Sequence, residues 1–244
     1  EQFTLSFEYY KNKSDDLLMN LVTSPSLGIW SGSKAANVGS VETNGLELTL
    51  GYNDFEGDFQ WSANLNLGTY KNEVLDLGGL KSVTPGGQFE GEAITRLEPG
   101  KPLFYFYGWK FDGVFASQAD ATAYLNGGQA GARGGDFRIV DVAGAPDANG
   151  NPTGPDGKID ANDRTEIGNP YPDLTLGVNL NASYKGFDLN LFIQGSYGND
   201  VCNTNIYDLE GMPRLFNAGT AVMRRWKQDG DITDIPRAPG SGAN

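Results

Sequence analysis

The stretch that most constrains the fold is residues 173–200, where apolar and polar side chains alternate along two arms joined by a tight turn at residues 184–187. A period of two over arms of about eleven residues predicts an antiparallel hairpin with one apolar and one polar face. The apolar positions are Leu174, Leu176, Val178, Leu180, Ala182 and Tyr184 on the first arm, and Phe187, Leu189, Leu191, Ile193 and Tyr197 on the second.

Two environments fit such a hairpin. Arms of roughly 9–11 residues are long enough for a tilted strand to cross a bilayer. Aromatic residues stand at both ends of the apolar face, as in the interfacial girdles of membrane barrels. A strand of a soluble sandwich alternates in the same way, with its apolar face in a core. The hairpin alone leaves both open.

The connections favour the membrane barrel. Residues 2–10, 45–52 and 59–68 alternate like the hairpin and predict three more strands. Residues 53–58 and 184–187 are short turns, whereas 11–44, 71–172 and 201–244 are predicted as long loops, with a short helix over 214–227. Successive antiparallel strands reverse direction, so the short turns lie at one end of the sheet and the long loops at the other, as in outer-membrane barrels. Loops beyond about 15 residues are uncommon in compact soluble domains.

The polar face and the strand count extend this interpretation. Small hydroxyl and amide residues line the polar face, which suits a wet lumen: Asn64, Asn66, Thr175, Asn179, Asn181, Ser183 and Gln194. A membrane sheet must close because hydrocarbon satisfies no free edge, so five strands imply further strands outside this chain. Residues 1–5 already alternate like a strand, and no apolar run approaches the ~20 residues of a membrane helix. We therefore expect a piece of a longer polypeptide with an all-β fold.

Composition excludes several kinds of chemistry. The chain has 31 acidic and 18 basic residues and a net charge of −13, which argues against nucleic-acid binding because no basic stripe can displace counterions. It has no histidine, so a Ser-His-Asp triad and His-ligated zinc are excluded. Its one cysteine, Cys202, allows no internal disulfide.

Residues 156–163, Asp-Gly-Lys-Ile-Asp-Ala-Asn-Asp, resemble the second half of an EF-hand-like calcium loop. The glycine permits the sharp turn, and Asp156, Asp160 and Asp163 offer hard oxygen ligands, with Asp141 as a further candidate. The first half departs from the pattern because an insertion at 145–155 separates Asp141 from the rest. An Asp/Gly/Asn turn without metal is the alternative.

The densest aromatic run is residues 103–115, LFYFYGWKFDGVF. Exposed aromatic side chains in a loop can stack on sugar rings or anchor a protein partner. Tyr105, Tyr107 and Trp109 are the candidates for such contacts. The alternative is that the run forms the packing core of its own loop.

With these segments defined, the chain resembles the SusC/RagA family of TonB-linked outer-membrane transporters. The matching stretches follow the family's order over nearly the whole chain, which makes the resemblance specific; the 145–155 insertion departs from it and bears most on the calcium assignment. The matches are residues 37–48, 100–113, 156–160, 163–173 and 184–189, with Trp226 and 235–237.

The resemblance implies a 22-stranded transmembrane antiparallel β-barrel with an N-terminal plug, of which this chain would hold about five strands and large extracellular loops, without the plug or the TonB-contacting segment. It implies import of oligosaccharides or peptides across the outer membrane, driven by the TonB complex, with a SusD-like surface lipoprotein as partner and no enzymatic activity. Trp226 joins the candidate substrate or partner contacts. The alternatives are a siderophore or cobalamin receptor of the same barrel class, and a secreted β-rich carbohydrate-binding or calcium-dependent adhesive module.

Overall fold

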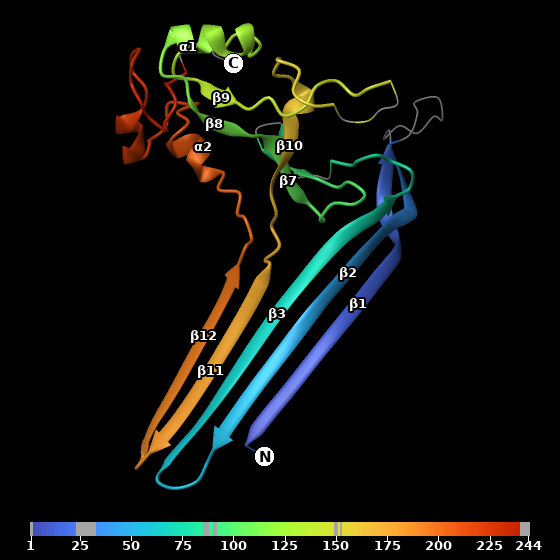
Figure 1. Cartoon of the computed structure of the whole chain (residues 1–244), viewed down its shortest axis with the longest axis vertical. Coiled ribbons are helices and arrows are strands. Elements are labelled where there is room, and N and C mark those ends of the chain that lie inside the picture. Colours follow the sequence, from blue (N-terminus) through green and yellow to red (C-terminus); the bar gives the residue numbers. More distant parts are fainter. Residues whose placement is uncertain are drawn as a thin grey trace. The chain divides into compact units, whose positions relative to one another are not determined.

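The computed structural model of the protein describes residues 2–22, 33–84, 88–89, 92–148, 151 and 153–239 (Figure 1). The chain forms two compact units. Unit 1 comprises Glu1–Gln88, Thr95–Phe106 and Gly168–Val201, and unit 2 comprises Phe89–Ile94, Tyr107–Ile167 and Cys202–Asn244. Each unit draws on separate parts of the sequence, so neither could be recognised from a contiguous segment.

Unit 1 is built on one five-stranded antiparallel sheet in the order β1-β2-β3-β11-β12 (Figure 1). β3 and β11 are neighbours in the sheet although residues 78–173 lie between them in the sequence. The chain leaves the sheet where β3 ends and returns to the same end of the sheet where β11 begins. The strands are β1 (Phe3–Val22), β2 (Ser33–Asp54), β3 (Phe59–Leu77), β11 (Leu174–Tyr184) and β12 (Phe187–Tyr197).

The β11–β12 hairpin confirms the prediction from residues 173–200, with Tyr184 paired to Phe187 across the turn. Lys185 and Gly186 at the centre of the turn have φ of 48° and 86°. Positive φ at both central residues is the type I′ geometry, whose twist matches that of the flanking strands. This turn and the one between β2 and β3 lie at the same end of the sheet, as predicted (Figure 1).

The first three strands are longer than predicted. The predicted loop over residues 11–44 is wrong where the structure describes it, because β1 continues to Val22 and β2 begins at Ser33. β3 likewise continues through residues 71–77. Apolar side chains leave the outer face in these upper parts, so the period-two signal that marks the lower parts is lost. Residues 23–32 lie outside the described residues.

Unit 1 also contains β6 (Thr95–Arg96), which pairs with β7 (Tyr105–Trp109). β4 (Gln88–Phe89) pairs with β5 (Glu92–Ala93). The core of this unit forms at the upper part of the sheet, where Val74, Leu77 and Tyr105 are buried.

Unit 2 holds short elements around a core of Phe115, Ala121 and Ile235. α1 begins after Ser117, whose hydroxyl accepts a hydrogen bond from the Asp120 amide at 3.1 Å, a helix N-cap. The predicted helix over 214–227 forms only as the 3₁₀ segment η4, and none of the described helices is long and apolar enough to cross a bilayer. The elements are β8 (Phe111–Val114) paired with β9 (Phe137–Ile139), α1 (Gln118–Ala123), η2 (Tyr124–Asn126), η3 (Ala161–Asp163), β10 (Arg164–Gly168), α2 (Asn205–Leu209) and η4 (Thr220–Arg224).

Candidate functional site

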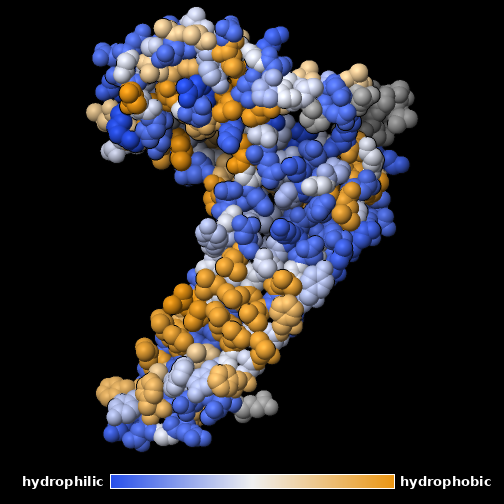
Figure 2. Space-filling model, in the orientation of Figure 1, coloured by the Kyte–Doolittle hydropathy of each residue, from blue (hydrophilic) through white to orange (hydrophobic). Residues whose placement is uncertain are grey.

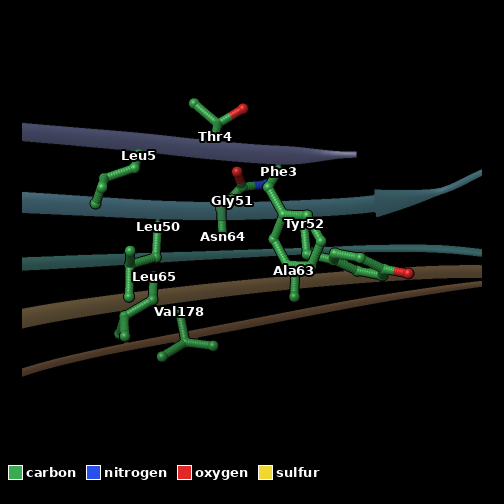
Figure 3. A pocket seen from close by; sticks show the side chains of 10 residues that line it. All are labelled: Phe3, Thr4, Leu5, Leu50, Gly51, Tyr52, Ala63, Asn64, Leu65 and Val178. Atoms are coloured by element: carbon green, nitrogen blue, oxygen red, sulfur yellow. The ribbon is translucent and has the colours of Figure 1, made fainter. Parts of the chain in front are cut away.

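In the lower part of the large sheet, most apolar side chains of all five strands lie on one face; Phe192, which pairs with Asn179, is an exception on the other face. Directly paired residues share a face, so the register extends each apolar position across the sheet. Figure 3 shows Leu5, Leu50, Leu65 and Val178 in one such row. These residues are among those that line a hollow of about 520 Å³. Phe3, Leu5 and Phe7 are 65–74% exposed, so within the described residues no second sheet covers this face. Figure 2 shows it as a continuous apolar band.

The height of the apolar band matches a bilayer. β11 has 11 residues, and its apolar positions run from Leu174 to Tyr184. At ~3.3 Å per residue this length is ~36 Å, which a tilt of ~40° reduces to ~28 Å, close to the ~25 Å apolar band of outer-membrane barrels.

Aromatic rings border the band at the end that carries the short turns. The ring centroids of Phe3 and Tyr52, and of Tyr52 and Trp61, are each 4.8 Å apart, and those of Phe59 and Tyr184 are 6.3 Å apart. At the other end, Tyr9 and Tyr197 are 63% and 74% exposed. Amphipathic rings at both limits are the arrangement of membrane-interface girdles.

The opposite face of the same sheet is polar and cross-linked by side-chain hydrogen bonds. The Thr49 hydroxyl donates to Asn66 Oδ1 at 2.9 Å. Asn181 Nδ2 donates to Ser62 Oγ at 3.1 Å, and Asn190 Nδ2 donates to Asn179 Oδ1 at 3.3 Å. This wall of amide and hydroxyl groups suits contact with water, as the sequence predicts for the lumen.

The outer face loses its apolar character above the band. Lys11 pairs with Asn44, and Asn44 pairs with Lys71, so the outer face becomes charged one row beyond Tyr9. On the inner face Val41 pairs with Val74, which is buried. The change on the outer face marks where the hydrocarbon contact ends.

The aromatic candidates of residues 103–115 divide by burial. Tyr105 is 2% exposed and its hydroxyl donates to Glu98 Oε2 at 2.9 Å, so it packs inside its own loop. Trp109 is 38% exposed, and the Arg164 guanidinium lies 4.0 Å from its ring centroid, a cation–π contact. Its indole N–H donates to the Asp160 carbonyl at 3.2 Å. Trp109 is thus held in place with one part of its ring accessible, while Tyr107 is half-buried.

The four carboxylates predicted as calcium ligands all accept backbone N–H groups of their own loop. Asp163 is fully buried; its Oδ1 accepts from Val142 and Ala143, and its Oδ2 accepts from Asp160 at 2.8 Å. Asp141 accepts from Gly157 at 2.7 Å, Asp156 accepts from the Lys158 amide, and Asp160 accepts from the Asn162 amide.

Within the part of the chain that the structure describes, no three acidic or cysteine side chains are grouped so as to hold a metal ion. The geometry therefore gives these carboxylates a capping role in the loop. Calcium binding by Asp141, Asp156, Asp160 and Asp163 stays a prediction of the sequence.

Trp226 connects the late part of unit 2 to residues 115–136. Its indole N–H donates to the Ala116 carbonyl at 2.9 Å, and its ring lies against Gly135. A Cβ at Gly135 would stand 2.5 Å from the ring, and the φ of Gly135 is +84°, so both space and backbone conformation require glycine there. Arg237 Nε donates to Asp136 Oδ1 at 2.6 Å beside this contact. The Gly134-Gly135 pair was the sequence signal for this packing, and sequence reasoning missed it.

Ionisable side chains form hydrogen bonds with both strands of the β8–β9 pair. Arg138 Nε donates to Asp112 Oδ1 at 2.6 Å, and this hydrogen bond raises the pKa of Arg138. Burial raises the pKa of Tyr124, whose hydroxyl donates to the Ile139 carbonyl at 2.8 Å. Both groups keep their usual charge state at neutral pH and act as structural ties.

The band, its aromatic borders and the polar inner face define this chain as part of a transmembrane antiparallel β-barrel. No family model matches the chain. Individual known proteins do match it, and they support this class. It is 34% identical over 95% of its length to TonB-dependent receptor P26 of Formosa agariphila, and 24% identical over 82% of its length to TonB-dependent receptor SusC of Bacteroides thetaiotaomicron.

The chain superposes on the structure of the RagAB peptide transporter with a TM-score of 0.72, at 23% identity over 98% of the chain and 24% of that structure. The chain belongs to the SusC/RagA family of TonB-dependent receptors. It spans 22% of the length of P26 and 18% of the length of SusC.

Proposed function

We propose that this chain supplies part of the barrel wall and part of the extracellular loops of an outer-membrane importer of oligosaccharides or peptides. In this proposal the TonB complex supplies the energy through a segment outside this chain. A SusD-like surface lipoprotein closes over the loops. The activity is transport rather than catalysis.

The observation that carries the proposal is the pair of opposite faces on one sheet. A continuous apolar face with aromatic borders fits lipid, and a hydrogen-bonded amide face fits a water-filled lumen. The 34% identity to a TonB-dependent receptor supports the same function, and the likeness to the RagAB peptide transporter supports the barrel.

The third sequence hypothesis, a secreted adhesive module, requires the apolar face to pack in a water-soluble core. Phe3 and Phe187, which stand on this face, are 74% and 80% exposed, which argues against such a core. The siderophore or cobalamin receptor remains the second candidate, since it would use the same barrel.

Uptake of defined substrates tests the proposal. A strain lacking the receptor that contains this chain should lose uptake of a labelled oligosaccharide or peptide pool, and dissipating the proton-motive force should abolish uptake in the parent strain. A ferric siderophore and cobalamin serve as matched substrates. Loss of their uptake with intact oligosaccharide and peptide uptake would assign the second candidate function and end the proposal.

A further inference from the structure

A polar cleft of about 320 Å³ opens in unit 1 directly above the apolar band. It lies beside the upper part of β3, where β11 no longer covers the strand: the last β11–β3 pair is Thr175 with Gly68, whereas β3 continues to Leu77. Lys71, Lys101, Asn44 and Tyr171 are among the residues that line it.

The wall of the cleft opposite β3 is fixed by backbone hydrogen bonds. The Gly100 amide donates to the Val74 carbonyl at 2.8 Å, and the Val74 amide donates to the Lys101 carbonyl at 3.0 Å. The Leu103 amide donates to Asn72 Oδ1 at 2.8 Å. Residues 100–103 thus line the stretch of β3 that β11 leaves open. This pairing places Lys101 beside Val74, and both Lys71 and Lys101 line the cleft.

The cleft lies at the edge of β3 and is lined from both faces of the strand, with Lys71 on the side of the apolar band and Tyr70 and Asn72 on the other. Lys71 follows Leu67 by four positions on β3, and side chains alternate along a strand, so both point outward. Lys71 also pairs with Asn44, and Asn44 with Lys11, one row beyond the Tyr9 row. Two residues at ~3.3 Å each, reduced by a tilt of ~40°, place this row ~5 Å beyond the band. That height falls within the polar headgroup layer of a bilayer.

The residues in and next to the cleft carry more positive than negative charge, unlike the chain as a whole. Lys11, Lys71 and Lys101 are positive and Glu42 and Glu73 are negative, on a chain whose net charge is −13. Lys11 pairs with Glu42 at 2.8 Å. The Lys71 ammonium forms no ion pair with any residue that the structure describes, and it is exposed. Glu73 is the one acidic group in the cleft lining.

We propose that this cleft binds the phosphate of an outer-leaflet lipid headgroup, with Lys71 and Lys101 as the cationic contacts and Asn44 as a neutral donor. The lipid's acyl chains continue onto the apolar band, so the site joins two surfaces that the strands already present to the membrane. The inference rests on the proposed function in one respect, since the band must lie in lipid.

Native mass spectrometry of the detergent-purified receptor tests the site. The probes are phosphatidic acid, diacylglycerol with the same acyl chains, and inorganic phosphate. Phosphatidic acid should be retained in preference to diacylglycerol. Each lysine near a charged headgroup strengthens binding of that headgroup about fivefold. Lys71→Gln should therefore weaken phosphatidic acid binding about fivefold, and Lys71→Gln with Lys101→Gln about 25-fold.

The matched control is Lys110→Gln with Lys227→Gln, which removes the same charge from exposed positions of unit 2 and should leave retention unchanged. Equal retention of phosphatidic acid and diacylglycerol by the unaltered receptor would overturn the proposal without any variant. Displacement of phosphatidic acid by inorganic phosphate at equal concentration would also overturn it, because the site would then take the free anion. Membrane insertion, measured separately by heat-modifiable electrophoretic mobility, reports on the barrel itself, so failure at this site alone leaves the proposed function standing.

Discussion

A charge placed on the lipid-facing side of the sheet tests the assignment of its two faces. Ile193 and Gln194 are consecutive on β12 but lie on opposite faces: Ile193 pairs with Val178 in the apolar row, and Gln194 pairs with Gly177 on the polar side. Replacing each in turn by Arg introduces the same side chain one residue apart. Gly177 leaves room beside Gln194, because a Cβ built on it meets only Asn66 atoms at 4.0 Å.

The position of Ile193 sets the magnitude. β12 runs from Phe187 to Tyr197, so Ile193 lies one residue, or ~3 Å, from its centre. An Arg near the bilayer midplane costs about 2–4 kcal/mol on the lipid face of a barrel. This cost lowers the ratio of folded to unfolded barrel by about 30- to 700-fold. Gln194→Arg points into water and should change the ratio little.

The assay is the fraction of receptor that runs as a heat-modifiable folded barrel in outer-membrane extracts. We expect Ile193→Arg to reduce this fraction strongly and Gln194→Arg to match the unaltered receptor. Equal folded fractions for the two variants, or a loss confined to Gln194→Arg, would refute the assignment of the faces and with it the barrel wall.

Asp163→Asn removes the charge from an acceptor of three backbone N–H groups, and because hydrogen bonds to charged groups contribute about 1.5–3 kcal/mol, we expect faster cleavage of the 141–163 loop by protease added to intact cells. Asp234→Asn, whose partner Arg224 is 64% exposed, is the control and should not change the cleavage rate. Calcium binding at the four aspartates predicts that a chelator accelerates cleavage of this loop, whereas identical rates with and without chelator would end that hypothesis. Trp226→Ala should expose residues 226–237 to protease, and Trp226→Phe, which keeps a ring but loses the hydrogen bond to Ala116, should give an intermediate rate. Trp109→Ala should weaken growth on the imported nutrient without lowering receptor abundance, whereas Tyr105→Ala should lower abundance because it empties a buried site; unchanged growth with Trp109→Ala would restrict that residue to loop packing.

The lower sheet could be predicted from the sequence because contact with lipid leaves a local signal. In a strand between hydrocarbon and water, apolar and polar side chains alternate, and this alternation can be recognised in the sequence. The β11–β12 hairpin therefore has the predicted bounds and turn. The upper parts of β1 and β2 carry no such signal, since both of their faces contain polar residues. Only hydrogen bonding to the neighbouring strand shows that residues 11–22 are extended.

The loop sites depended on contacts between distant residues. The aromatic run around Tyr105 gives no sign of which ring is buried, because its burial comes from packing in the folded loop and its hydrogen bond from Glu98. The capping of backbone amides by Asp163 joins residues about twenty positions apart, and the contact of Trp226 with Gly135 joins residues that are further apart still.

The amino-acid sequence by itself determined the strand period, the apolar and polar faces and the family. The period and the faces follow from neighbouring residues, and the family follows from short motifs in a fixed order. The tertiary structure decided the row of lysines above the band, the cleft beside β3 and the burial of Asp163. The physical reason is that strand register and long-range hydrogen bonds bring together side chains whose spacing in the sequence carries no information about their distance in space.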